Sequence, residues 1–213
     1  DYYCDWSSDV CSSDLCNRFA MQGQEPNPLT RDEFELLITK GCLHRQDSAA
    51  ITLAVYTGLR PGELCALAVE DIDLDGGQIN ITRAITANGT FKVPKTGKPR
   101  SVLLMPPALE ACRVLMSLVA DHPQRPIEVF QNRHESRQEK VTPLLSPTTQ
   151  ARKKIINFWY VPTAWNTKWA AVQKRSGIRP RRPYQTRHTY ACWCLTAQDR
   201  KSTRLNSSHN SNL

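Results

Sequence analysis

Apolar side chains recur every three or four positions along several stretches of the chain, a spacing that predicts helices. Thr30 and Glu33 have the form of a capping box, and an apolar helical pattern follows them. Gly58 ends a later apolar run, and Pro61 suits the first turn of the next helix. The predicted helices span residues 31–40, 48–56, 62–66, 108–120, 148–159 and 162–175, and a last one carries Arg187.

Alternation of apolar and polar residues predicts a small sheet in the middle of the chain. The dipeptide Asn88-Gly89 is a strong hairpin signal, and a second tight turn is expected at 95–98. Together with the helices, these strands predict an α+β fold, mostly helical, with a small three-stranded antiparallel sheet. The predicted strands lie at residues 78–84, 91–93 and 100–105.

The composition favours one domain of ordinary size. The chain has 213 residues, of which 40% are hydrophobic and 23% are charged. Segment 121–147 is rich in Pro, Gln, Arg and Glu and is interpreted as a mobile region. No apolar stretch is long enough to span a bilayer and no signal segment opens the chain. We therefore expect a cytoplasmic protein with no membrane partner.

The two ends of the chain differ in character from the rest. Residues 7–16 read SSDVC followed by SSDLC, a repeat with little to bury, and the tail from about residue 200 is also polar. Both ends resemble translated sequencing-adapter sequence, with ordinary disordered tails as the alternative. We expect residues 1–20 and 198–213 to be non-native or disordered and residues 21–197 to form the domain.

The eight cysteines suggest neither disulfides nor a zinc site. Cys42, Cys65 and Cys112 stand in apolar positions, where cysteine behaves as a small hydrophobe. No CxxC pair occurs in the sequence, and Cys192 and Cys194 fall on different faces of a predicted helix. A reduced chain fits this pattern best.

Positive charge is concentrated in the second half of the chain, whose overall net charge is +8. Residues 138–197 contain eleven Lys or Arg and one acid, Glu139. Such a block would neutralise several phosphates of a nucleic acid, whereas the alternative is a solvated basic face on an unrelated enzyme. The predicted DNA-binding residues are Arg152, Lys153, Lys154, Lys168, Lys174, Arg175, Arg181 and Arg182.

Two short runs, far apart in the chain, each place one arginine at a structurally marked position. The first is TGLRPGEL at 57–64, where Arg60 stands between a glycine that ends one helix and a proline that begins another. The second is PYQTRHTY at 183–190, which carries Arg187. A guanidinium is permanently charged and its planar fork matches two phosphate oxygens. Two convergent arginines therefore indicate chemistry on a DNA phosphate.

These runs resemble the arginine boxes of the tyrosine recombinase catalytic domain, in the branch of phage and integrative-element integrases. The resemblance covers roughly residues 29–197. It implies site-specific cleavage and rejoining of double-stranded DNA through a 3′-phosphotyrosyl intermediate, without a metal or an energy cofactor. It also implies that Arg60 and Arg187 clamp the scissile phosphate and that Glu63 supports Arg60. A purely structural Arg–Glu brace at this spacing is the alternative.

The family also places a lysine in a hairpin turn after the first box, and the run PKTGKPRSV at 94–102 matches that position. The resemblance assigns Lys95 as the general acid that protonates the leaving 5′ oxygen, with Lys92 and Lys98 as alternatives.

The second box departs from the family at one position. The family usually has His or Lys three residues before the arginine, where this chain has Tyr184. A phenol, with a pKa of about 10, is a poor base at neutral pH, but it can donate a hydrogen bond to a phosphate or orient Arg187. His188 lies about 100° around the helix from Arg187 and is interpreted as a packed or capping histidine.

The family's next boxes, a Gly-His pair and the nucleophilic tyrosine, would fall in the polar tail and beyond Leu213. We therefore expect a chain truncated before the nucleophile, which binds DNA weakly and cuts nothing. The family's N-terminal helical domain is also missing from the sequence. The resemblance implies that the full-length parent acts as a homotetramer on DNA.

Three other classes of protein match parts of this pattern. A basic, helix-rich DNA-binding regulator without strand chemistry would leave Arg60 and Lys95 unrelated in space. A type IB topoisomerase-like enzyme shares the chemistry, but the integrase-like boxes and the short length favour a recombinase. A nuclease usually needs clustered carboxylates to hold metal, and none stands beside either arginine in the sequence.

Overall fold

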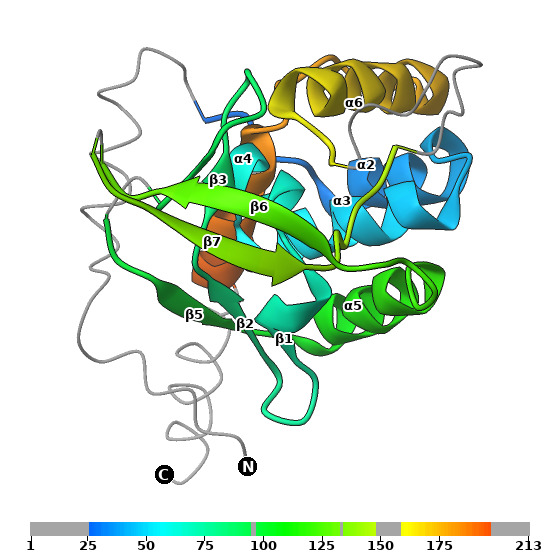
Figure 1. Cartoon of the computed structure of the whole chain (residues 1–213). Helices are drawn as coiled ribbons and strands as arrows, with labels where there is room; N and C mark the ends of the chain where they lie inside the picture. The colour runs from blue at the N-terminus through cyan, green and yellow to red at the C-terminus, as the bar shows by residue number, and fades with distance from the viewer. Residues whose placement is uncertain (1–25, 95–96, 133, 148–158, 197–213) are drawn as a thin grey trace, which may run out of the picture.

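The computed structural model describes residues 26–94, 97–132, 134–147 and 159–196 (Figure 1). The helical elements are α2 (Arg31–Leu36), the π-helical turn η1 (Leu37–Gly41), α3 (Arg45–Thr57), α4 (Pro61–Cys65), the 3-10 turn η2 (Val69–Asp71), α5 (Pro106–Leu118), α6 (Pro162–Ser176) and a last helix at 185–196. The strands are β1 (Ile72–Asp73), β2 (Gln78–Ile81), β3 (Ala84–Ile85), β4 (Phe91–Lys92), β5 (Arg100–Leu103), β6 (Arg125–Phe130) and β7 (Ser136–Val141).

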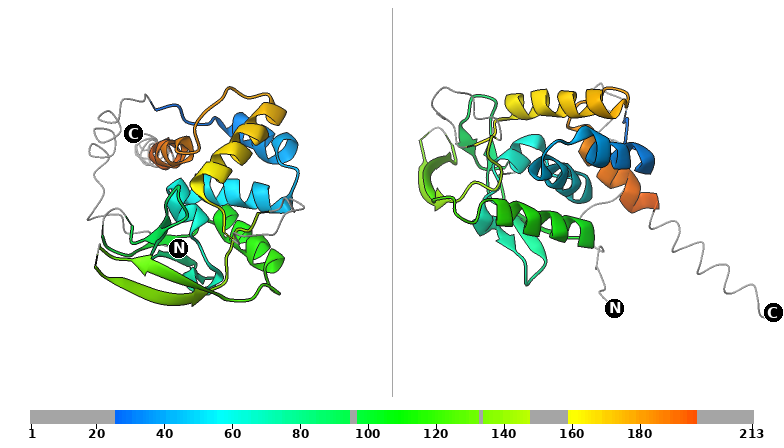
Figure 2. Two further views of the ribbon diagram at one scale, coloured as in Figure 1. Left: turned by 45° about the horizontal axis from the view of Figure 1, so that its top comes forward. Right: turned by 90° about the vertical axis from the view of Figure 1, so that its right-hand side faces the viewer.

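The helices gather on one side of the strands, as the two views of Figure 2 show. Helix α3 lies at the centre and is buried along most of its length, with Leu53 and Val55 fully covered. Helix α5 packs against α3, and α6 packs against η1 and α4. The predicted α+β fold is confirmed. Among the described helices, none is long and apolar enough to cross a bilayer.

The strands form two sheets. The first is three-stranded and antiparallel, with the order β1–β2–β5, and it pairs Ile79 with Val102 and Ile81 with Arg100. The second has the order β3–β4–β6–β7 and is mixed, because β4 pairs with β6 in parallel. The predicted strand at 78–84 is therefore split between the two sheets. Residues 78–81, which form β2, pair with β5. Ala84 and Ile85, which form β3, pair with β4 across the predicted turn at Asn88-Gly89.

The interpretation of 121–147 as a mobile region is wrong. Strands β6 and β7 pair antiparallel over all six residues of each, from Arg125 opposite Val141 to Phe130 opposite Ser136. Ile127 and Val129 face the core, whereas Glu128 between them is exposed. A strand pair that buries only one face needs few apolar residues, so the polar composition of this segment did not indicate strands. The predicted helix at 148–159 and the predicted ends at 1–20 and 198–213 lie outside the described residues.

An arginine occupies a core-facing position at the junction of the two sheets. Arg83 follows Ile79 and Ile81 on the same inward face, and its side chain is only 3% exposed. It donates to a carboxylate oxygen of Asp71 at 2.7 Å, to one of Glu139 at 2.7 Å, and to the carbonyl of Ala66 at 3.2 Å. Burial raises the pKa of Asp71 although Arg83 acts against it. This ion group fastens β7 to the segment where β2 passes into β3.

The beginning and the end of the described chain are joined by hydrogen bonds. The backbone N–H of Asn27 donates to the side-chain oxygen of Gln185 at 2.9 Å. The backbone N–H of Leu29 donates to the hydroxyl of Thr189, also at 2.9 Å and fully buried. Both acceptors lie on the helix at 185–196. We call these bonds the terminal clasp, and it fixes that helix against the segment before α2.

Replacing Arg83 with methionine should strongly destabilise the protein. The substitution keeps most of the apolar stem but leaves the Asp71 carboxylate buried without its cation, which costs about 3–5 kcal/mol. Urea unfolding of Arg83→Met and of the unmodified chain measures this difference in the free energy of unfolding.

Arg113→Met serves as the control, because Arg113 is 54% exposed and, among the described residues, its one salt bridge is a surface pair with Glu110. Its free energy of unfolding should change by less than about 1 kcal/mol. Equal losses in the two variants would contradict a structural role for the buried ion group.

Candidate active site: an arginine cluster at a helix corner

Arg60 stands at the corner between α3 and α4. Helix α3 ends at Gly58, whose φ of 62° is a left-handed conformation that favours glycine, and its N–H donates to the carbonyl of Ala54. Leu59 is buried, and Pro61 opens α4 with a preset φ. The backbone on both sides of Arg60 is therefore fixed, which sets the point from which its side chain leaves the chain.

Glu63 is the buried centre of the site, since its side chain is 1% exposed. Its Oε1 accepts from Nη1 of Arg60 and from Nη1 of Arg100, each at 3.0 Å. Its Oε2 accepts from the backbone N–H of Arg60 at 2.9 Å and from Nη2 of Arg100 at 2.6 Å. Burial alone would raise the pKa of Glu63, but the hydrogen bonds and charges of the two arginines hold it below its ordinary value of 4.5.

Arg187 reaches the same corner from the helix at 185–196. Its Nη1 donates to the carbonyl of Gly58 at 2.7 Å. The ring of Tyr190, one turn further on, lies so close to Gly58 that a Cβ there would come within 2.6 Å of it. Burial lowers the pKa of Arg187, and the nearby charge of Arg60 lowers it further. The structure thus brings together Arg60 and Arg187, which are far apart in sequence.

Tyr184 and His188 flank Arg187 on the same helical segment. Their rings meet edge to face, with centroids 5.5 Å apart. Tyr184 is half-buried and near enough to Arg187 to influence its pKa. His188 is buried, and both burial and the charge of Arg187 lower its pKa below 6.5, which favours the neutral imidazole at pH 7. This placement agrees with the interpretation of His188 as a packed histidine.

The arrangement is suited to binding an oxyanion. The guanidinium groups of Arg60 and Arg100 bond the Glu63 carboxylate, and that of Arg187 lies near enough to interact with it, so this arginine cluster has an excess of positive charge. The side chains of Arg60 and Arg100 are 28% and 31% exposed, which lets a ligand reach them. A phosphate oxygen would offset the positive charges of Arg60 and Arg100, which add to the effect of burial in lowering the pKa of Arg187. Within the described residues no group of His, Cys, Asp or Glu could hold a metal ion.

Lys95 lies outside the described residues. The residues on either side of that position close the predicted turn, because the N–H of Gly97 donates to the carbonyl of Pro94 at 2.7 Å. The turn precedes β5, the strand that begins with Arg100.

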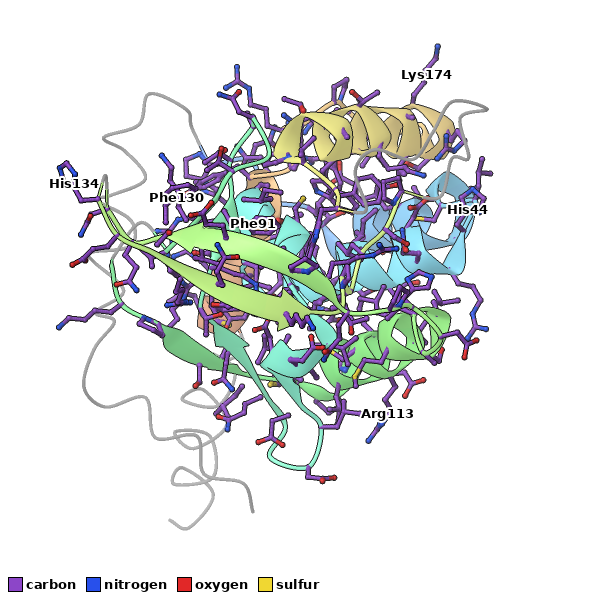
Figure 3. All side chains as sticks on the ribbon, in the orientation of Figure 1. His44, Phe91, Arg113, Phe130, His134 and Lys174 are labelled. Atoms are coloured by element: carbon purple, nitrogen blue, oxygen red, sulfur yellow. The ribbon has the colours of Figure 1, made fainter. Side chains whose placement is uncertain are left out.

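The predicted DNA-binding set divides into three groups. Arg152, Lys153 and Lys154 lie outside the described residues. Lys174 and Arg182 are exposed, and Lys174 points away from α6 in Figure 3. Lys168, Arg175 and Arg181 are each bonded within the protein, although Arg175 is also exposed.

The structure does not support Arg181 as a DNA contact. Its side chain is 1% exposed, and its Nη2 donates to both carboxylate oxygens of Glu33 at 2.7 Å. Lys168 pairs with the buried Asp47 at 3.1 Å, and Arg175 donates to the carbonyl of Gly41 at 2.7 Å. Counting basic residues in a sequence cannot distinguish cations that face solvent from cations that hold elements together.

Three cysteines of the described chain, Cys42, Cys65 and Cys112, are unreactive because of their environment. Burial raises the pKa of the thiols of Cys42, Cys65 and Cys112 to about 12. Thiolates, which are the nucleophilic form, are therefore scarce at neutral pH.

Comparison with known proteins shows which family the chain resembles. Residues 28–201 match the model of the phage integrase family. The chain is 42% identical over 175 residues to IntQ of Escherichia coli (strain K12), a protein named as defective. It is 38% identical over 177 residues to the prophage integrase IntR of the same strain. These matches cover 81% of this chain but only 44% and 42% of the two relatives, so the chain spans less than half of their length.

Solved structures share the fold at low sequence identity. The XerA recombinase has a TM-score of 0.58 and 22% identity, with 81% of this chain and 52% of that chain covered. The Tn1549 transposon integrase in complex with transposon right end DNA has a TM-score of 0.62 and 17% identity, with 89% and 58% covered. The fold is that of a tyrosine recombinase catalytic domain. The chain belongs to the phage integrase family.

The stability that Glu63 contributes should depend on pH with a definite sign. Its folded pKa lies below 4.5, so its contribution is fully present above pH 4.5 and is lost as the pH falls through the folded value. The difference in free energy of unfolding between the unmodified chain and Glu63→Gln should therefore shrink as the pH falls below 4.5. Urea unfolding at a series of pH values measures it.

Glu110→Gln is the matched control, because Glu110 is 67% exposed and pairs only with Arg113. Its difference from the unmodified chain should stay small throughout that pH range. A Glu63→Gln difference that grows with acidification would show that the two arginines do not stabilise the charged carboxylate.

Proposed function

We propose that the chain is the phosphate-binding catalytic part of a site-specific DNA recombinase. The observation that carries the proposal is the meeting of Arg60 and Arg187 at the Gly58 corner, over a buried carboxylate that fixes Arg60. In this proposal the two guanidinium groups bind the non-bridging oxygens of one phosphate. They stabilise the charge that develops there when the strand is cut.

The remaining roles in this proposal are those that the family resemblance implies. Lys95 protonates the leaving 5′ oxygen as general acid. Tyr184 donates a phenolic hydrogen bond to a phosphate oxygen or holds Arg187 in place. The full-length parent supplies a tyrosine nucleophile, forms the 3′-phosphotyrosyl intermediate and works as a homotetramer on double-stranded DNA, with no metal or other cofactor.

The 213-residue chain itself is proposed to bind DNA without cutting it. Its sequence has no tyrosine after Tyr190. The ring of Tyr190 packs on Gly58, and Tyr160 is buried, so neither is placed to attack a phosphate. The integrase of Tn1549 was solved with transposon DNA, which supports DNA as the partner here.

A DNA-binding regulator without strand chemistry remains the second candidate. Its supporting observation is a group of exposed cations outside the arginine cluster, among them Lys174, Arg175 and Arg182. Such a protein has no need of a buried carboxylate that orients Arg60, so the recombinase is the better proposal.

DNA binding should depend on Arg60 more than on a typical surface arginine. Nonspecific affinities of basic domains are on the order of 10⁻⁴ to 10⁻⁶ M at physiological salt. Arg60→Met should weaken binding of a short DNA duplex about tenfold, since it removes a charge-assisted phosphate contact. It should also reduce the slope of log affinity against log salt by about 1. Fluorescence anisotropy at several salt concentrations measures both quantities.

The control for lost charge is Arg113→Met, because Arg113 points away from α5 into solvent (Figure 3). Its affinity should fall by less than about twofold. If Arg60→Met and Arg113→Met weaken binding equally, the arginine cluster is not a phosphate site.

The chain should form no covalent adduct with DNA. A suicide substrate, in which a nick beside the scissile bond traps the covalent intermediate, should leave the protein at its free mobility on a denaturing gel. A shifted band would contradict the proposal that the 213-residue chain lacks its nucleophile. Tyr184→Phe and Tyr190→Phe would then show which hydroxyl had reacted.

A further inference from the structure

Arg100 is the member of the cluster that the sequence did not single out. It is the first residue of β5, and it lies 37 positions after Glu63 in the chain. Both of its Nη groups bond Glu63, at 3.0 and 2.6 Å, in the forked arrangement by which arginine grips a carboxylate. Its charge also contributes to lowering the pKa of Arg187. Arg100 is therefore part of the same electrostatic site as the two predicted arginines.

The bonds to Glu63 are unequal. Arg100 occupies both carboxylate oxygens with its side chain, whereas Arg60 reaches only Oε1 with its side chain and Oε2 with its backbone N–H. The fork of Arg100 thus sets the plane of the carboxylate. That plane, in turn, sets where Nη1 of Arg60 must lie.

The unequal bonding to Glu63 also decides how many N–H donors of Arg60 remain for a ligand. In the described part of the chain, the Nη1 contact to Glu63 is the only side-chain hydrogen bond of Arg60. A guanidinium has five N–H donors, so most of Arg60 can still serve an oxyanion. Without Arg100, Arg60 would be the one salt-bridge partner that Glu63 keeps among the described residues, and the buried carboxylate would pull it into a two-point pair. Arg60 would then be withdrawn from the ligand.

We infer that Arg100 is a positioning residue for Arg60, acting through Glu63. This inference rests on the proposed function, since it assigns Arg60 to the phosphate. It also links two parts of the proposed site: β5 begins at Arg100, downstream of Lys95 in the sequence, and Arg100 fixes the carboxylate that orients Arg60. The carboxylate of Glu63 then fixes the position of β5 relative to the corner that carries Arg60.

The first test follows the Arg60 side chain directly, by NMR of arginine guanidinium groups in the full 213-residue chain. With Arg100 present, the Nη1 protons of Arg60 should exchange slowly and give resolved signals, because Glu63 holds them. In Arg100→Met these signals should move and their exchange rate should change severalfold. In Arg113→Met they should be unchanged. Unchanged Arg60 signals in Arg100→Met would overturn the inference and leave the proposed function standing.

The second test is a double-mutant cycle on binding of a short DNA duplex. Arg60→Met and Arg100→Met should each weaken binding, but Arg100→Met should add less than about twofold when Arg60 is already methionine. Two losses that simply multiply would mean that Arg100 contacts phosphate itself, and the positioning role would be wrong. If the unmodified chain binds DNA independently of Arg60, the proposed function fails, while the NMR result still decides the role of Arg100.

Arg100→Lys separates geometry from charge and covers the case in which Arg100→Met does not fold. Lysine keeps the positive charge beside Glu63 but cannot form the planar fork. The Arg60 signals should then take an intermediate position, and DNA affinity should fall by less than in Arg100→Met. Full restoration by lysine would show that charge alone suffices and would refute the positioning geometry.

Discussion

The carboxylate of Glu63 is the constraint on which the site depends. A buried negative charge is costly unless opposite charges and hydrogen bonds compensate it, and here two arginines from different elements do so. Arg60 comes from the corner after α3, and Arg100 comes from the start of β5. The carboxylate is satisfied only when both elements are in place. The fold and the charge pattern of the site therefore form together, and neither arginine is held by its own element alone.

Those parts of the fold that local signals specify were predicted from the sequence. The capping box at Thr30 starts α2 as expected, Gly58 ends α3, and the turn at Asn88-Gly89 joins β3 to β4. The parts that failed depend on distant partners. The strand at 78–84 divides near Arg83, which bonds acids from other elements, and β6 and β7 looked polar because only one face is buried. Neither the partners of Arg83 nor the buried face of β6 and β7 can be recognised from the neighbouring residues in a single sequence.

The site residues also divide into those that local sequence signals identify and those that depend on distant contacts. Arg60 and Arg187 were identified by their boxes, and the structure brings them to one corner. Glu63 was predicted as a support for Arg60, and it lies one turn away, bonded to it. Arg100 was missed because its contact with Glu63 links a strand to a helix far back in the chain. The burial of Arg181 was missed for a related reason, since a basic residue count carries no information on what each cation faces.

The terminal clasp has a consequence for the order in which the protein is made. Asn27 and Leu29 leave the ribosome early, but their partners on the helix at 185–196 are among the last described residues to be synthesised. The corner around Gly58 can likewise receive Arg187 only after that helix has emerged. In a nascent chain, the core elements would already be present while the terminal clasp and the contact of Arg187 with Gly58 are still unformed. Any activity on phosphate would begin only when translation of the domain is complete.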